Sequence, residues 1–73
     1  MLRADMVVTW TTTIGGRRFG YVMELSQDGS RARVQASNAW FWLDCDQLTP
    51  SDVPAREVIA ADQRAIYGPA LLG

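Results

Sequence analysis

Three short turn signals in the first half of the chain constrain its fold most strongly. Gly15-Gly16, Asp28-Gly29 and Ser37-Asn38 each separate two segments that favour β-structure. Gly-Gly and Asp-Gly are favoured two-residue hairpin loops because both central residues need a positive φ. If each pair forms such a loop, the chain folds into four successive antiparallel strands. The predicted strands run over about residues 6–14, 18–26, 31–36 and 39–44.

The three loops also predict one register. Counting outward from them places Met23 opposite both Val8 and Val34, and places Val34 opposite Phe41. Side chains alternate between the two faces of a strand, so a slip of one residue would move a whole apolar set to the other face. Agreement among three independent turns therefore predicts one shared core face. The residues predicted to face inward are Val8, Trp10, Tyr21, Met23, Leu25, Val34, Phe41 and Leu43.

The remainder of the chain predicts a short strand and then a helix. Residues 48–50 suit a fifth strand, and the proline at its end requires an edge position or a strand end. Apolar residues then recur at helical spacing, and Gly68-Pro69 supplies a stop signal, which predicts a helix over about residues 54–67 and a short tail over residues 70–73. Asp62 interrupts the apolar stripe of this helix, so we expect the helix to need a docking surface.

Several segments together resemble a known fold family. They are Phe19-Gly20-Tyr21-Val22, Asp28-Gly29, Ala32-Arg33-Val34 and Trp42-Leu43-Asp44-Cys45-Asp46-Gln47-Leu48-Thr49-Pro50. The last segment is similar to the tryptophan, aliphatic residue, short 3₁₀ turn, leucine and proline that end the SH3-like small barrels of the KOW and Tudor type. The resemblance covers roughly residues 5–50 and implies a mainly β fold, a five-stranded antiparallel barrel over residues 1–50. We expect residues 51–73, the C-terminal helix and tail, to pack on the same domain or on a partner. This barrel serves peptide, nucleic-acid, assembly and catalytic roles, so the resemblance selects no single function.

Length and composition limit the class of protein. A chain of 73 residues makes one small domain, near the lower end of what a hydrophobic core holds together unaided. Association with a partner or with itself is therefore expected. No apolar run approaches the roughly 20 residues of a membrane span, and the start of the chain lacks the pattern of a secretory signal, so we expect a cytoplasmic protein. A single cysteine, Cys45, suits a reducing compartment.

Charge and residue types disfavour most chemistry. All seven cationic residues are arginine, which we interpret as a GC-rich codon bias in a bacterial or phage source, such as a mobile element. The net charge of -1 disfavours general nucleic-acid binding, although aromatic residues with arginines also suit single-stranded nucleic acid. The chain contains no histidine, the usual general base and the commonest metal ligand. We therefore predict no catalytic residue, no cofactor site and no metal site.

The predicted register places two tryptophans on the outer face of the sheet. Trp40 and Trp42 lie two residues apart there, with Arg33 opposite both Trp42 and Glu24, a geometry in which the guanidinium stacks on the indole and pairs with the carboxylate. Arg31 opposite Asp44 predicts an ordinary cross-strand ion pair. Such an aromatic patch usually marks an interaction site. The predicted partner-binding residues are Val22, Glu24, Arg33, Gln35, Trp40 and Trp42, with Val7 beside them.

The sequence leaves three alternatives for what covers this face. The C-terminal helix covers it, with Val58, Ile59 and Ile66 on the indoles; or a second copy meets it in a symmetric contact; or a different partner binds it through an aromatic groove or by adding a strand. We expect a non-enzymatic interaction module or small assembly subunit that acts through the aromatic outer face of the sheet. A KOW-like or Tudor-like nucleic-acid module is the main alternative.

Two further candidate sites lie outside the aromatic face. Arg17 and Arg18 at the first turn suggest a possible anion or nucleic-acid contact, against a solvated hairpin tip. Cys45 lies between two aspartates whose charge suppresses the thiolate, and the resemblance to the barrels implies a small buried apolar role for it. For the function of the whole chain, a third alternative is an oligomeric enzyme, suggested by a likeness in fold to the type II dihydrofolate reductases. Their Val-Gln-Ile-Tyr segment is matched here only by Val34-Gln35, which argues against reductase activity.

Overall fold

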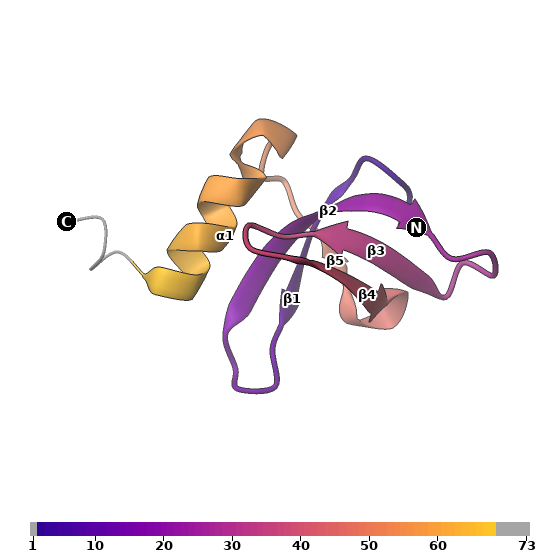
Figure 1. The fold of residues 1–73 in the computed structure, drawn as a ribbon, viewed down its shortest axis with the longest axis horizontal. Coiled ribbons are helices and arrows are strands. Elements are labelled where there is room, and N and C mark those ends of the chain that lie inside the picture. The colour runs from indigo at the N-terminus through magenta and orange to yellow at the C-terminus, as the bar shows by residue number, and fades with distance from the viewer. Residues whose placement is uncertain (1, 69–73) are drawn as a thin grey trace.

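The computed structural model describes residues 2–68, and the tail predicted over residues 70–73 lies outside that range. The described part is one antiparallel sheet of five strands with a C-terminal helix (Figure 1). The strands are β1 (Val7–Thr11), β2 (Arg17–Leu25), β3 (Arg31–Gln35), β4 (Trp40–Asp44) and β5 (Thr49–Pro50). A 3₁₀ turn, η1 (Cys45–Gln47), precedes β5, and a second, η2 (Ala55–Glu57), leads into the helix α1 (Val58–Tyr67).

The sheet is open. Its strand order is β4-β3-β2-β1-β5, so β4 and β5 form its two edges. The mainly β prediction, the five antiparallel strands and the C-terminal helix are confirmed. The prediction of a closed barrel is wrong, because β5 has only two residues and pairs with β1, at the opposite edge from β4.

The third hairpin has the predicted register. Ala32 lies opposite Leu43, and Val34 lies opposite Phe41. Ser37 and Asn38 form the loop, closed by a 2.8 Å hydrogen bond from the Ala36 amide to the Ala39 carbonyl. In both β3 and β4 the residues on one face are apolar and those on the other are polar or aromatic, so the register set by the loop agrees with the alternation of side chains.

The second hairpin follows the prediction only as far as a β-bulge. Leu25 pairs with Ala32 and Glu24 with Arg33, as expected, but Met23 has no partner in the ladder and Val34 pairs with Val22 instead. A bulge adds one residue to one strand and reverses the faces beyond it. Val22 is therefore fully buried and Met23 is 43% exposed, so the predictions of Val22 on the outer face and Met23 in the core are both wrong. The prediction of Tyr21 in the core is wrong for the same reason, because Tyr21 pairs with Gln35 on the outer face.

The first hairpin differs more. The predicted two-residue Gly15-Gly16 loop is wrong: Thr12 and Gly16 close a three-residue loop, with hydrogen bonds from Thr12 N to Gly16 O (2.7 Å) and from Gly15 N to Thr12 O (2.9 Å). Only Gly15 has a positive φ, 86°, as in a turn that ends in a G1 bulge. Val8 consequently pairs with Gly20 rather than Met23, and β1 is shorter than the predicted residues 6–14.

The core lies on the face of the sheet that carries Val8, Trp10 and Val34, with Leu48 added from the chain before β5. The Trp10 ring meets Phe41 edge-on, at 6.3 Å between centroids and 70° between planes. Gly20 is required beneath this indole, because a Cβ there would overlap the Val34 side chain and lie 3.2 Å from Trp10 Cη2. The partly buried residues around this core are Leu2, Met6, Leu25, Phe41, Leu43 and Cys45.

The helix packs beside β2 and the β3–β4 turn (Figure 1). Its buried residues are Val58, Ala61 and Asp62. Asp62 is fully buried and accepts hydrogen bonds from the Arg18 side chain, the Phe19 amide, and the amide and hydroxyl of Ser37, all between 2.7 and 3.0 Å. Across residues 2–68, no helix has the length and apolar character needed to cross a bilayer.

Candidate interaction face

The candidate site is the outer face of β2, β3 and β4, on the side of the sheet away from the core. Two rows of side chains cross it. Tyr21, Gln35 and Trp40 form one row, and Glu24, Arg33 and Trp42 form the next. We refer to these six residues and Met23 as the aromatic face.

The exposed apolar surface of this face is concentrated on two elements. Trp40 and Trp42 on β4 are 53% and 37% exposed, whereas Phe41 between them is partly buried on the core side. Met23, which the bulge in β2 turns outward, is 43% exposed. The predicted outward orientation of both tryptophans is therefore confirmed, but the position opposite Gln35 that the prediction gave to Val22 is held by Tyr21.

Arg33 organises the polar part of the face. Its Nη2 and Nε lie 2.7 and 2.9 Å from Glu24 Oε2, and its guanidinium carbon lies 5.7 Å from the Trp40 ring centroid. The Glu24 pairing is as predicted, but the guanidinium stacks on Trp40 rather than on Trp42, because the side chain leans along the strand to the diagonal neighbour. At this exposure the stack contributes about 0.5–1 kcal/mol. Its main effect is to hold the guanidinium on the indole.

The neighbouring polar groups are also tied down. Gln35 Nε2 donates to the carbonyl oxygens of Ala36 (2.9 Å) and Ala39 (3.3 Å), so this predicted partner-binding residue braces the β3–β4 turn. Arg31 and Asp44 form the predicted ion pair at 3.5 Å, with both side chains exposed. The face is thus a preset surface of indole, thioether and paired charges.

The C-terminal helix leaves this face uncovered. The hypothesis that Val58, Ile59 and Ile66 pack on the indoles is wrong, because α1 docks beside β2 and the β3–β4 turn. Val58 is buried there, and Ile59 is itself 41% exposed. Val7, which was expected beside the tryptophans in water, is buried. Of the three alternatives that the sequence left open for what covers this face, a second copy of the chain and a different partner remain.

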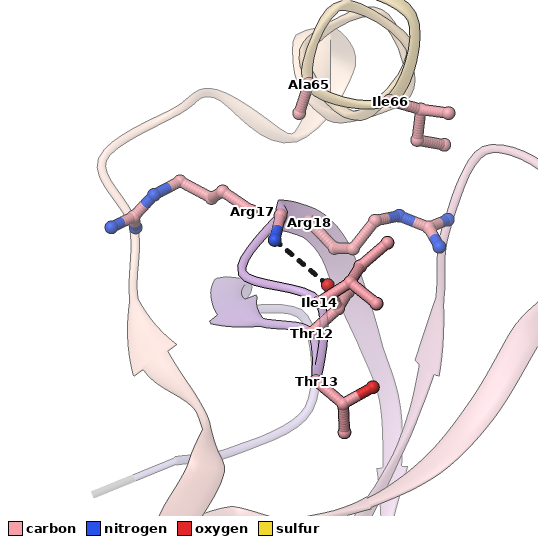
Figure 2. Close-up of a pocket in the computed structure, with 8 residues that line it drawn as sticks. Thr12, Thr13, Ile14, Arg17, Arg18, Ala65 and Ile66 are labelled. Carbon is pink, nitrogen blue, oxygen red and sulfur yellow. Dashed lines mark hydrogen bonds between the residues drawn. The ribbon is translucent and has the colours of Figure 1, made fainter.

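A small pocket lies between the first hairpin and α1. Its volume is about 350 Å³, and its walls include Ile14, Ala65 and Ile66 (Figure 2). Arg17 and Arg18 both line it, but their guanidinium groups point in opposite directions (Figure 2). Arg17 Nη1 donates to Thr9 Oγ1 at 3.2 Å, while Arg18 is paired with Asp62. The structure therefore does not bring the two arginines together as an anion-binding pair.

Cys45 is partly buried against the core and its Sγ donates to the Gly29 carbonyl at 3.4 Å. Burial, followed by the charges of Asp46, Asp44 and Asp28, raises the pKa of this thiol. A raised pKa disfavours the thiolate, the nucleophilic form of cysteine. Within residues 2–68, no cluster of three or more potential ligand side chains is placed to hold a metal ion.

Three residues were missed by the sequence reasoning. Tyr21 was placed in the core, because the bulge that reverses the faces of β2 was not foreseen. Met23 had no signal, because nothing in residues 21–25 distinguishes a bulged strand from a regular one. Asp62 had one: a carboxylate in the apolar stripe of a helix is a candidate for a buried, hydrogen-bonded contact.

In a comparison with known proteins, no protein-family model, no curated protein and no solved structure matches this chain.

Proposed function

We propose that this chain is a non-enzymatic protein-interaction module, or a small assembly subunit, with an SH3-like fold of the KOW or Tudor type. The aromatic face is its binding surface. The observation that carries the proposal is the exposure of Trp40 and Trp42 side by side on an edge strand, with Met23 exposed on the same sheet. Contiguous exposed apolar patches on small soluble proteins mark interaction sites.

The chemistry of the face suits a protein surface. Tryptophan, methionine and arginine are enriched at protein interfaces, and buried tryptophan and arginine dominate binding energies. Arg33 is already held by Glu24 and Trp40, so binding orders few additional side-chain torsions. A partner that covers the two indoles gains their apolar area at a low entropic cost.

The charges of the face favour a protein over a nucleic acid. Binding of a phosphate backbone needs cations that are free to meet it. Arg33 is neutralised by Glu24 at 2.7 Å, and Arg31 is paired with Asp44. Because the whole chain also carries a net charge of -1, these arginines give the face no strong positive potential.

A double substitution tests the proposal. The variant Trp40→Ser/Trp42→Ser removes both indoles, while Ile59→Ser/Tyr67→Ser removes two comparably exposed apolar residues from α1. Each chain is immobilised and exposed to a lysate of the source organism, and bound proteins, including copies of the chain itself, are quantified by mass spectrometry. We expect the tryptophan variant to capture at least about tenfold less of the specific partner than the wild type, in line with hot-spot energies. The helix variant should capture as much as the wild type.

Circular dichroism and urea unfolding establish that both variants are folded. Equal capture by the wild type and the tryptophan variant would show that the aromatic face is not the binding surface. A parallel titration with single-stranded oligonucleotides at low salt follows tryptophan emission. Quenching that saturates and disappears in the tryptophan variant would replace the protein-binding proposal with the nucleic-acid one.

A further inference from the structure

We propose that the partner of the aromatic face is a second copy of this chain, and that the two copies join by antiparallel pairing of their β4 strands about a two-fold axis at Trp42. This inference rests on the proposed function, because it names the partner of the same surface. The result would be one continuous sheet of ten strands, with the two aromatic faces adjoining on one side.

The backbone of β4 has the geometry for strand addition. The Ala36 amide donates to Ala39, and the Cys45 amide donates to Ser30, which fixes the alternation of hydrogen bonds between β3 and β4. Odd-numbered residues of β4 face β3, so the amides and carbonyls of residues 40, 42 and 44 point away from the sheet. The Trp42 carbonyl confirms this direction, because it accepts a hydrogen bond from Arg31 Nη2 at 3.1 Å. A carbonyl oxygen has a second lone pair for a partner amide.

The other edge of the sheet is protected. β5 has two residues and ends at Pro50, whose nitrogen has no hydrogen to donate. In contrast, β4 carries the apolar run Trp40-Phe41-Trp42-Leu43, with no lysine or proline to block an added strand. Strand addition is therefore directed to β4.

One antiparallel register of two β4 strands uses all the outward-facing groups. It places Trp42 opposite Trp42 of the second copy, and Trp40 opposite Asp44 in both directions. Shifting the strands by two residues leaves one of these positions unpaired at each end. In the symmetric register a surface patch meets itself, which a two-fold dimer requires.

The side chains also match on both faces in this register. On the outer face the paired indoles meet as a cross-strand aromatic pair, flanked on each side by Arg33 with its Glu24. On the core face, Phe41 lies opposite Leu43 of the second copy, and both residues are only partly buried in the single chain. No two like charges lie directly opposite each other. A strand that adds to this edge must supply apolar residues at alternating positions on both faces. A second β4 strand meets this requirement.

A proline substitution at Asp44 tests the pairing without removing an indole. Asp44 has φ -66°, which proline adopts without strain, and its amide faces away from β3. In the dimer, Asp44→Pro would remove two symmetry-related hydrogen bonds. Asp44→Ala is the matched control, because it loses the same exposed ion pair with Arg31 but keeps the amide. Equilibrium sedimentation then measures the dissociation constant of each variant.

We expect the wild type and Asp44→Ala to form dimers, and Asp44→Pro to dimerise at least about 100-fold more weakly, from two lost hydrogen bonds and the steric block. Hydrogen exchange of the wild type gives a second readout that needs no variant. The amides of Trp40 and Trp42 should become protected as protein concentration rises.

A wild type that stays monomeric at millimolar concentration would overturn the inference, as would dimers of Asp44→Pro as tight as those of Asp44→Ala. Either result leaves the proposed function standing if the Trp40→Ser/Trp42→Ser variant still loses a captured protein. If that variant retains both its dimer and every captured protein, the proposed function fails together with the inference.

Discussion

Asp62 joins the helix to the sheet at a point where two strands separate. Tyr21 pairs with Gln35, so the next hydrogen-bonded pair along the β2–β3 ladder, two residues on, would be Phe19 and Ser37. Their amides donate instead to the two oxygens of the Asp62 carboxylate, at 2.9 Å each. The carboxylate thus satisfies two backbone donors that would otherwise be left unpaired at the end of the ladder.

Arg18 makes the buried charge of Asp62 tolerable. Its Nε and Nη2 lie 2.8 and 3.0 Å from the two carboxylate oxygens, a bidentate pairing, and its guanidinium carbon lies 5.6 Å from the Phe41 ring centroid. Burial alone raises the pKa of the Asp62 carboxyl, but the hydrogen bonds from Arg18, Phe19 and Ser37 outweigh it and lower the pKa to about 2. The folded protein therefore holds Asp62 ionised.

The first prediction concerns this residue and pH. Because the pKa of Asp62 falls from 3.8 to about 2 on folding, its ionised form stabilises the fold above pH 3.8, and this contribution is lost as pH falls through about 2. We expect Asp62→Asn to lower the free energy of unfolding by about 3 kcal/mol at pH 7 and to reduce the loss of stability below pH 4. Urea unfolding between pH 2 and pH 7 measures both effects.

Two variants make this measurement specific. Asp28 has a pKa of about 2 as well, lowered by the Ser30 amide and then by the hydroxyls of Ser26 and Ser30, so Asp28→Asn identifies the part of the acid sensitivity that belongs to that loop. Asp52→Asn changes an exposed carboxylate and should alter stability by no more than about 0.5 kcal/mol. An unchanged pH profile in Asp62→Asn would contradict the role assigned to the carboxylate.

The hairpins show which elements can be predicted from sequence. Ser37-Asn38 and Asp28-Gly29 sit between strands whose apolar pattern agrees with the loop, and there the register near each loop is as predicted. Gly15-Gly16 offers two glycines where only Gly15 needs a positive φ, so the sequence favours a two-residue loop over the three-residue loop that forms. In the register that forms, Trp10 packs over Gly20, a contact between residues ten positions apart that the two glycines of the turn do not encode.

The two register errors cancel in one respect. The three-residue loop shifts β1 by an odd number of residues relative to β2, and the bulge at Met23 reverses the faces once more. Val8 and Trp10 therefore face inward as predicted, although their partners differ. The third and fourth strands carry no such error, and for this reason the tryptophan pair of the candidate site could be predicted while Val22 and Met23 could not.

The helix supplies the second prediction, at the scale of an element. An isolated helix of 10 residues is marginal in water, so α1 depends on its docked side. Val58 is 4% exposed and the adjacent Ile59 is 41% exposed, which makes them a matched pair. We expect Val58→Ser to cost about 2 kcal/mol of unfolding free energy and Ile59→Ser less than half as much. Equal losses in urea unfolding would show that the helix does not dock through the Val58 side.

At the scale of the whole molecule, the small core and the open sheet edge both leave apolar side chains incompletely buried. The fully buried side chains are mostly valine and alanine, and the larger Phe41, Leu43 and Leu25 are only partly buried. A domain of this size gains relatively little from burial on its own. Pairing of β4 with a second copy would add apolar contacts at the edge where the core is least covered, and would thereby couple folding to assembly.

This coupling gives the last prediction. If the native chain dimerises through β4, mass action makes the midpoint of thermal unfolding depend on protein concentration. We expect the midpoint of the wild type and of Asp44→Ala to rise by several degrees between micromolar and millimolar chain, because each 1 kcal/mol of added stability shifts the midpoint of a domain this size by about 4–8 °C. Asp44→Pro, which dimerises more weakly, should show a much smaller rise over the same range. Differential scanning calorimetry over this range measures the dependence, and a constant midpoint for all three chains would show that the fold gains nothing from a second copy.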